Sequence, residues 1–379
     1  MKILYSSTYN TLSGGNRSLL GLIDKELEIG NDVVAITPFD KDSSPIYSEL
    51  LKRKIQQKRI HFTTYAFGPY SFKIGPRRII NELLAELQIL FFMMKCKPDV
   101  FHINTLSSTN GFYAAKLLGI PIVWHIREFV EEDYNFVFYE RDKLFRMLRT
   151  SDAVIAISKT IQESFKKKIH WDYIDMIYNG IDVDYYSIKN KKIFQKEQIN
   201  IGIVGRIIPG KGQIDAVNAI NELHRRGIDN VTLHIYGGEP EEEYFEKLKK
   251  TIVENKVNAV IEGCLFNMLP AYESLDILLV CSKFEPFGRV TIEGMLAGCL
   301  VVGSNTAGTA ELIEHGVNGL CYQEGNVLAL ADALQYALSN KEIMKDISQN
   351  AQKWAKENFS AEKNAQRINE IYTRVVKKL

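Results

Sequence analysis

The sequence is poor in cysteine and has no cysteine pair at a spacing typical of metal or redox sites. Its five cysteines stand in 379 residues without any Cys-x-x-Cys sequence, and three of them lie in or beside apolar runs. We therefore expect buried free thiols in a reducing compartment instead of a disulfide framework. The positions are Cys96, Cys264, Cys281, Cys299 and Cys321.

Long hydrophobic runs are also missing. The longest uninterrupted apolar run, Ile89 to Met94, is far shorter than the roughly 20 residues that span a bilayer. The first residues, Lys2 to Ser6, resemble a strand and not the apolar stretch of a signal peptide. We expect a cytoplasmic protein that is not integral to a membrane.

Neither sign of charge dominates, because the sequence has 47 Lys and Arg and 46 Asp and Glu, a net charge of +1. This balance argues against a nucleic-acid binder. Residues 52–97 are the exception, with ten cations against Glu82 and Glu86, a local excess of +8. This stretch is either a solvated helix face above a core face or an amphipathic surface that touches anionic lipid. The second interpretation, with the protein peripheral at the inner face of the plasma membrane, suits a lipid-linked acceptor.

Short apolar runs alternate with helix-like segments along the whole chain, which predicts an α/β protein with parallel sheets. A chain of 379 residues is longer than a single hydrophobic core usually supports, so we expect two domains. The alternation breaks near Asn179 to Asp182. We therefore predict two Rossmann-like domains, 1–180 and 181–358, with a ligand cleft at the carboxyl ends of their strands. The last segment, 359–379, has helical periodicity.

Two glutamates eight positions apart, Glu285 and Glu293, surround a short turn between two strand-like runs. A crossover helix must begin at this turn, so the main-chain amides of Phe287, Gly288 and Arg289 would face an anion such as a phosphate. Glu293, about one turn into the helix, is placed to accept hydrogen bonds from a vicinal diol such as a ribose. Glu285 would face the group beyond the phosphates.

Two cations occupy one loop after the first strand of the second half, in the sequence Gly205-Arg206 to Lys211-Gly212. Arg206 and Lys211 are expected to neutralise a diphosphate as it loses its sugar. Gly14-Gly15 is not a Gly-x-Gly-x-x-Gly fingerprint, which argues against a dinucleotide oxidoreductase. Asp182-x-Asp184 is interpreted as a turn, and we expect no metal site and no cofactor.

The segment from Glu285 to Glu293, with the Gly-Arg and Lys-Gly pairs upstream, resembles the retaining glycosyltransferases of family 4, whose pattern is E-x7-E. The resemblance spans nearly the whole chain and is strongest from Gly205 to Gly319. It implies the GT-B fold, in which the final helix crosses back onto the first domain. Departures from the family pattern occur at Arg289, Gly294 and Leu300.

The same resemblance assigns roles to single residues. It gives the catalytic roles to Glu285, His125, Arg206 and Lys211, with His125 near the transferred sugar. It places donor contacts in the first domain at Gly15, and at further positions in the second domain: Glu293, Phe287, Gly288, Arg289, Cys264, Leu265, Gly308 and Thr309. His102 and Asn104 end a strand of the first domain and are expected to border the acceptor.

Together these features predict a retaining, metal-independent glycosyltransferase. It would move a hexose from a nucleotide diphosphate sugar, UDP favoured over GDP, to a glycan or lipid-linked acceptor in cell-surface polysaccharide biosynthesis. Two alternatives stay open: a sugar-nucleotide binding protein without turnover, and a UDP-sugar epimerase of two-Rossmann architecture. The epimerase would need acid and base carboxylates in the first domain. Donor sugar, acceptor, linkage and oligomeric state are not encoded in any recognisable pattern.

Overall fold

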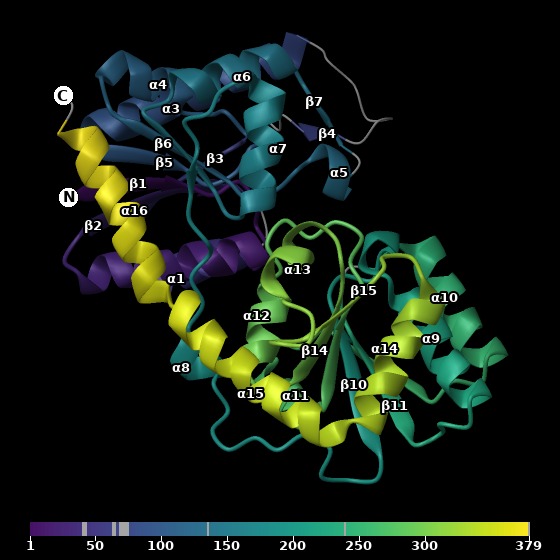
Figure 1. Cartoon of the computed structure of the whole chain (residues 1–379). Coiled ribbons are helices and arrows are strands. Elements are labelled where there is room, and N and C mark those ends of the chain that lie inside the picture. Colours follow the sequence, from purple (N-terminus) through teal and green to yellow (C-terminus); the bar gives the residue numbers. More distant parts are fainter. Residues whose placement is uncertain (40–43, 63–65, 68–75, 135, 239, 378–379) are drawn as a thin grey trace. The chain divides into compact units, whose positions relative to one another are not determined.

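The computed structural model describes residues 1–39, 44–62, 66–67, 76–134, 136–238 and 240–377, and it divides into two compact units (Figure 1). Unit 1 comprises Met1–Gly180 together with Ala361–Leu379, and unit 2 comprises Ile181–Ser360. Each unit is built around its own parallel sheet. The predicted class, α/β with two Rossmann-like domains, is confirmed.

Unit 1 contains a seven-stranded sheet of order β3-β2-β1-β5-β6-β8-β9, in which every pairing is parallel. Strands β5, β6 and β8 are buried at every position, as expected where a parallel sheet is covered on both faces. The strands are β1 Lys2–Ser6, β2 Asp32–Pro38, β3 Gln56–Ile60, β5 Val100–Ile103, β6 Ile122–Ile126, β8 Ala153–Ala156 and β9 Asp175–Met176.

The helices of unit 1 include the last one of the chain, α16, which packs on α1. Its buried stripe, Ile368, Ile371, Tyr372 and Val375, joins the core of the first strands. A short antiparallel pair, β4 Ala66–Phe67 and β7 Val137–Phe138, stands apart from the main sheet. The helices are α1 Gly14–Glu28, α2 Pro45–Lys52, α3 Pro76–Cys96, α4 Phe112–Leu118, α5 Glu131–Tyr134, α6 Arg141–Thr150, α7 Lys159–Ile169 and α16 Ala361–Val376.

Unit 2 contains a six-stranded parallel sheet of order β12-β11-β10-β13-β14-β15. Its strands are β10 Ile199–Val204, β11 Val231–Tyr236, β12 Ala259–Gly263, β13 Ile277–Val280, β14 Leu300–Ser304 and β15 Leu320–Tyr322. Its helices are α8 Val183–Tyr186, the 3₁₀ turn η1 Pro209–Lys211, α9 Gln213–Arg225, α10 Glu242–Glu254, α11 Leu269–Ser274, α12 Arg289–Leu296, α13 Ala307–Leu312, α14 Val327–Ser339 and α15 Lys341–Asn358.

The strand order of each sheet contains one switch point. In unit 2 the chain runs from β10 to β11 and β12 on one side, then returns to place β13 on the other side of β10. In unit 1, β2 and β5 flank β1 in the same way. Loops that leave neighbouring strands in opposite directions separate at such a point, and open α/β sheets bind ligands there.

Among the described strands, β3, β4, β7, β9 and β15 were not predicted, because each is very short or lacks an apolar run. Strand β3, Gln-Gln-Lys-Arg-Ile, lies at the edge of its sheet, where polar and basic side chains are tolerated and discourage pairing with another chain. Strand β15 has only three residues. Asp182 accepts a hydrogen bond from the Tyr185 amide (2.9 Å) and caps α8, which is the structural turn that the sequence predicted.

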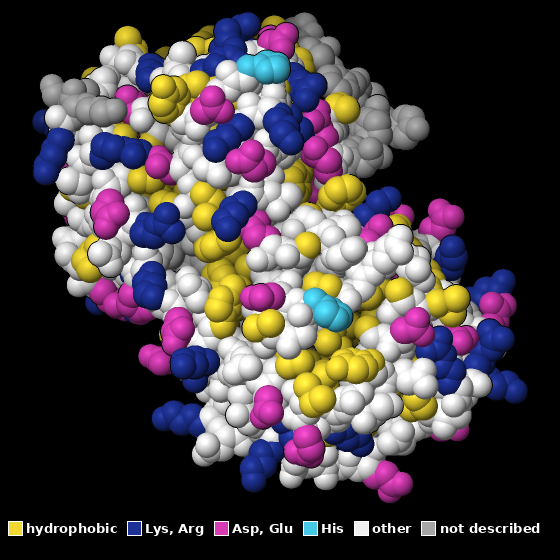
Figure 2. Space-filling model, in the orientation of Figure 1, with side chains coloured by type: hydrophobic (Ala, Val, Ile, Leu, Met, Phe, Trp, Pro, Cys, Tyr) yellow, Lys and Arg dark blue, Asp and Glu magenta, His cyan; other side chains and the backbone are white. Residues whose placement is uncertain are grey.

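No helix in the described parts of the chain is long and apolar enough to cross a membrane. On the face shown in Figure 2, Lys and Arg side chains are interspersed with Asp and Glu over both units, in keeping with the near-zero net charge.

Candidate functional site

The loops that follow β10 and β13 are joined to each other at the switch point of unit 2. The Lys283 amide donates to the Gly210 carbonyl at 3.0 Å. Gly212 has a φ of +70°, and a Cβ at this position would lie 2.5 Å from the Cys281 carbonyl oxygen, so a side chain would force the two loops apart. The glycine therefore brings Lys211 to the end of β13.

Lys211 and Glu285 form an ion pair at this place, with 2.6 Å between Nζ and Oε2. Their side chains are 25% and 19% exposed, so the pair is largely shielded from water but can still be reached by a ligand. Arg206 is exposed on the same loop, where its carbonyl accepts a hydrogen bond from Gln213 Nε2 (2.8 Å). Lys211 carries a compact ammonium group on a flexible side chain, so it is suited to exchange Glu285 for a phosphate as its partner.

Helix α12 begins at the turn predicted from the two glutamates. Gly288 precedes it with a φ of +91°, a conformation that favours glycine, and no side chain caps this end. The Gly308 amide donates to the Glu285 carbonyl (2.8 Å) and so fixes the start of the turn. Phe287 packs its ring against Phe359 with centroids 5.8 Å apart, so only its main chain can serve a ligand.

Glu293 is held by two protein partners. Arg289 Nε lies 2.6 Å from Oε1, and the Tyr272 hydroxyl donates to Oε2 at 2.9 Å. The carboxylate is only 7% exposed. Burial, together with the neighbouring Glu293 carboxylate, raises the pKa of Tyr272 well above its usual range, so its hydroxyl stays protonated and donates. The sequence indicated Glu293 but gave no sign of Tyr272.

The other residues predicted in unit 2 lie on the neighbouring loops. Cys264 is exposed in the loop after β12. A Cβ built on Gly238 would lie 3.0 Å from the Cβ of Cys264, so this loop packs against the main chain just after β11. Leu265 beside it is 37% exposed. Thr309 is fully buried on α13, and its hydroxyl has no hydrogen-bond partner among the described residues. The expectation of buried thiols therefore fails at Cys264, which sits in a loop and not in a strand.

A buried polar cluster forms at the carboxyl ends of β5 and β6 in unit 1. Arg127 is its centre: Nε donates to Asn104 Oδ1 (2.7 Å), a terminal nitrogen donates to Asn179 Oδ1 (2.5 Å), and the other approaches His125 Nδ1 (3.3 Å). His102 Nε2 lies 3.3 Å from the same His125 nitrogen. The cluster thus brings together His102, Asn104 and His125, the three strand-end residues predicted from the sequence.

Gly15 lies at the start of α1 beside this cluster, because a Cβ built on it would be 3.6 Å from Arg127 Cδ. The glycine pair at the start of α1 therefore borders Arg127, the centre of the cluster. Arg127 was not assigned a role from the sequence. Arg127 follows His125 by two residues, and side chains two positions apart in a strand lie on the same face. This spacing could have predicted that Arg127 lies beside His125.

Glu128 adds a buried carboxyl to unit 1. It accepts hydrogen bonds from the Thr105 hydroxyl and from the Leu106 amide, the latter at 2.7 Å. Burial raises the pKa of Glu128 to about 7. The two hydrogen bonds tie the loop after β5 to the loop after β6, which is a structural task.

Comparison with known proteins agrees with this architecture. A family model described as glycosyl transferases group 1 matches residues 185–354, and one described as glycosyltransferase family 4 matches residues 12–185. An uncharacterised 41.2 kDa protein in the cps region of Klebsiella pneumoniae is 31% identical over 303 residues, which cover 72% of this chain and 80% of that protein. The chain belongs to this family of glycosyltransferases.

Two further relatives show how far the likeness extends. The capsular polysaccharide biosynthesis glycosyltransferase CapM of Staphylococcus aureus is 23% identical over 79% of this chain and 83% of its own length. The crystal structure of Anabaena HepE in complex with UDP-glucose superposes with a TM-score of 0.82 at 21% identity, over 99% of this chain and all of that one. The fold is that of the GT-B glycosyltransferases.

Proposed function

We propose that the protein is a retaining, metal-independent hexosyltransferase that uses a nucleotide diphosphate sugar, with UDP as the nucleotide. The observation that carries this proposal is the Lys211–Glu285 pair, which lies next to the start of α12 at the switch point of unit 2. The cation and the helix N-terminus suit a diphosphate, and the buried carboxylate one turn further on suits a ribose.

Each residue then has a chemical task. Lys211 and Arg206 bind the diphosphate and offset the charge that develops on it as the bond to the sugar breaks. Glu293 accepts from the ribose hydroxyls, and Glu285, once released by Lys211, faces the hexose. The acceptor hydroxyl forms the new bond on the face from which the diphosphate departs, and its proton goes to a departing phosphate oxygen. Gly15, Gly308 and Thr309 complete the donor contacts, Cys264 and Leu265 offer main-chain groups to the base, and His102 and Asn104 border the acceptor.

The relatives support the choice of donor and pathway. HepE has been crystallised with UDP-glucose, and CapM is described as acting in capsular polysaccharide biosynthesis. We infer a glycan or lipid-linked acceptor in cell-surface polysaccharide biosynthesis, and a cytoplasmic location, where nucleotide sugars are made available to such enzymes.

A ligand screen tests the donor. The purified protein is expected to melt at a higher temperature with UDP and one UDP-sugar than with GDP, ADP or their sugars, because a ligand that binds only the folded state stabilises it. Addition of EDTA should leave the shift unchanged. A shift that appears only with a divalent cation would contradict metal independence, and a larger shift with GDP would contradict the choice of UDP.

Two other functions are compatible with the same binding site, namely nucleotide-sugar binding without turnover and epimerisation. The first is disfavoured because Lys211 and Glu285 form a charge pair that simple binding does not require. The epimerase needs acid and base carboxylates beside the sugar. In unit 1 the buried carboxyl of Glu128 is instead engaged by Thr105 and the Leu106 amide.

Helix α3 carries an apolar face that is exposed to solvent, and we propose that this face binds an anionic membrane. Its opposite face is buried through Ala85, Ile89 and Met93. Single exposed apolar residues are common, but a continuous helical stripe of them marks an interaction surface. The stripe consists of Ile79, Ile80, Leu83, Leu84, Leu87, Phe91 and Met94, each 42–67% exposed.

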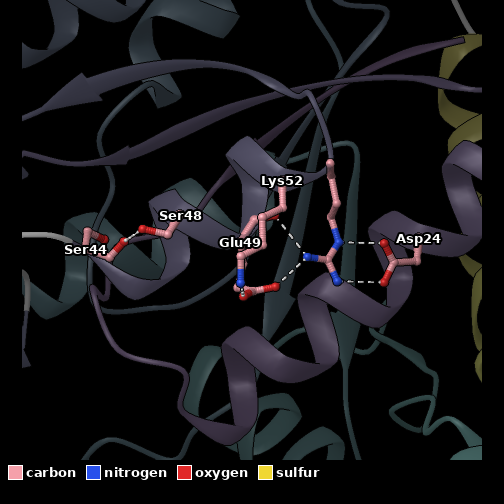
Figure 3. Close-up of polar contacts among 6 residues, drawn as sticks. Asp24, Ser44, Ser48, Glu49 and Lys52 are labelled. Atoms are coloured by element: carbon pink, nitrogen blue, oxygen red, sulfur yellow. Dashed lines mark hydrogen bonds and ion pairs between the residues drawn. The ribbon is translucent and has the colours of Figure 1, made fainter.

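The basic charges of residues 52–97 are divided between different surfaces. Arg53 is bound by Asp24 (2.6 and 2.9 Å) and by Glu49 (2.9 Å), and Lys52 pairs with Glu49 (2.6 Å), so these cations are neutralised by acids outside the stretch (Figure 3). Residues 63–65 and 68–75 lie outside the described residues. Exposed cations remain near the ends of α3, at Arg77, Lys95 and Lys97, and they complement an anionic surface.

Vesicle sedimentation tests the membrane proposal. The protein is expected to bind phosphatidylglycerol vesicles, and the double variant Leu83→Glu, Leu87→Glu should bind at least about tenfold more weakly, since each buried leucine contributes ~1.5 kcal/mol or more. Val253→Glu, which changes an exposed apolar residue of unit 2 (74%, against 61% for Leu83 and 42% for Leu87), is the control. Equal binding of the double variant, or dimerisation through α3 in place of vesicle binding, would overturn the proposal.

A further inference from the structure

A cavity of about 490 Å³ lies at the amino ends of β8 and β9 in unit 1. The carboxyl ends of β5 and β6, which carry the cluster around Arg127, are at the opposite edge of the same parallel sheet. The cavity is therefore separate from the site described above, and none of the residues that line it has a task in the proposed transfer. Its volume falls in the range of roughly 300–1,000 Å³ that is usual for small-molecule sites.

Two aromatic side chains line this cavity, and both belong to the loop between α7 and β9. Tyr173 is 79% exposed and Trp171 is partly exposed, and their ring centroids are 5.9 Å apart with an angle of 60° between the planes. A single exposed aromatic residue needs no explanation, but two adjacent rings at one hollow indicate a binding surface. Side chains of this kind offer a large contact area at a low entropic cost, since each has only two rotatable bonds.

The loop that carries the rings is fixed at both of its ends. At its start, the Trp171 amide donates to the Lys166 carbonyl of α7 (3.3 Å). At its end, Ile174 is buried, its amide donates to the Asp172 carbonyl (2.9 Å), and its carbonyl accepts from Gln162 Nε2 (2.6 Å). The main chain beneath the two rings is therefore ordered before a ligand arrives, which reduces the entropic cost of binding.

The charged groups around the cavity are almost balanced. Asp152, Asp172 and Asp175 line it together with a single guanidinium, that of Arg374, so a phosphate-bearing ligand would be repelled. Two of these carboxylates already have a cation as partner: Asp175 is paired with Arg374, and Asp152 lies 3.6 Å from Lys116 Nζ. Little attraction is left for a cationic ligand. The charges at the cavity therefore favour a neutral ligand.

A neutral sugar matches this combination of groups. A hexopyranose ring has an apolar face of C–H groups, which packs on aromatic rings, and a rim of hydroxyl groups, which both donate and accept hydrogen bonds. The exposed carboxylate of Asp172 is able to accept from two hydroxyls, and the guanidinium of Arg374 donates only. The cavity thus offers an apolar surface together with acceptors and donors for hydroxyl groups.

We propose that this cavity, the Trp171–Tyr173 site, binds a neutral segment of a glycan chain. When a chain grows by repeated transfer, a second point of attachment keeps the acceptor near the enzyme and raises its effective concentration. The assignment of the bound glycan to the growing acceptor rests on the function proposed above, whereas the binding of a neutral glycan does not.

Nitrogen–proton NMR of the three tryptophan indole groups tests the site in the absence of a donor. The probes are the hexasaccharides of glucose, mannose, galactose and N-acetylglucosamine. At least one of them is expected to shift the Trp171 signal, assigned from Trp171→Phe, and to leave the signal of the buried Trp124 unchanged. Tyr173→Ala should weaken this binding about tenfold, the scale of one aromatic contact, at an unchanged melting temperature.

Two further measurements define the site and its use. Tyr336→Ala, which removes an exposed tyrosine of unit 2 (48%), is the control and should bind the hexasaccharide as the wild type does. Transfer is then measured with long and short fractions of an acceptor extract. Tyr173→Ala should raise KM about tenfold for the long acceptors, with kcat and the KM for short acceptors unchanged.

The outcomes separate this site from the proposed function. The site is overturned if none of the four hexasaccharides shifts the Trp171 signal, or if Tyr173→Ala binds as tightly as the wild type. A shift with hexalysine in their place, or with protein concentration alone, would also overturn it, in favour of a basic peptide or a second copy of the chain. An unchanged KM for long acceptors would remove the acceptor role. Glycan binding by a protein that transfers no sugar would contradict the proposed function and leave the site intact.

Discussion

Lys211→Ala is expected to lower the rate of transfer by about 10²-fold or more, as loss of a charge contact to a developing anion does. The structure adds a second cause. Lys211 Nζ lies 2.6 Å from Glu285, so its removal leaves a poorly solvated carboxylate next to the diphosphate. The leaving group would then lose a cation and gain an unpaired negative neighbour. Steady-state kinetics with the UDP-sugar found in the ligand screen measures this effect.

How the loss of activity in Lys211→Ala is divided between KM and kcat identifies the role of Lys211. A contact made mainly in the transition state lowers kcat, whereas a contact made equally to the bound donor raises KM. We expect kcat to carry most of the loss. Lys250→Ala on α10 removes a lysine that is 73% exposed and serves as the matched control. A Lys211→Ala enzyme that turns over at the rate of this control would remove Lys211 from the leaving-group site.

Glu293→Gln is expected to weaken UDP binding by at least about tenfold, because hydrogen bonds to a charged acceptor contribute roughly 1.5–3 kcal/mol and 1.4 kcal/mol is a factor of ten. Glutamine keeps the size of the side chain and one carbonyl oxygen. It loses the charge that complements Arg289 and the second acceptor oxygen that serves a diol. Calorimetric titration with UDP measures the change.

Glu293→Ala should also destabilise unit 2. Arg289 is only 17% exposed and Tyr272 is fully buried, so both would lose a buried partner, at a cost of about 3 kcal/mol or more. The double variant Arg289→Leu, Glu293→Ala also removes the cation that loses this carboxylate, and it should regain most of that stability in urea unfolding without regaining UDP affinity. If Glu293→Gln binds UDP as tightly as the wild type, Glu293 does not contact the nucleotide.

The fold was largely predictable because a parallel sheet buries both faces of its strands and so leaves apolar runs in the sequence. Strands such as β10 and β13 could be predicted from the sequence for this reason. Strand β3 was not, since an edge strand has no need of apolar side chains and its Lys58 and Arg59 indicate surface. The pattern of turns and runs does not encode strand order, so the switch points had to come from the structure.

The site was predictable only where it is local in sequence. Glu285 and Glu293 share one turn and helix, so their spacing was informative. Their partners Lys211 and Tyr272 come from other loops, and the pairs form because the strand order places β10 beside β13 and because α11 packs nearby. The hydrogen bond between Tyr372 and His102 joins residues 270 positions apart, and a tyrosine in an apolar helical stripe is indistinguishable from an ordinary core residue.

The most direct test of the central claim is an NMR time course of an isotopically labelled UDP-sugar with the purified protein, an acceptor extract and EDTA. The account predicts that UDP appears together with a glycosidic anomeric signal of the same configuration as the donor. An inverted anomeric signal would contradict the retaining mechanism. A donor that becomes epimerised with its diphosphate intact, or that binds and stays unchanged, would contradict the transferase itself.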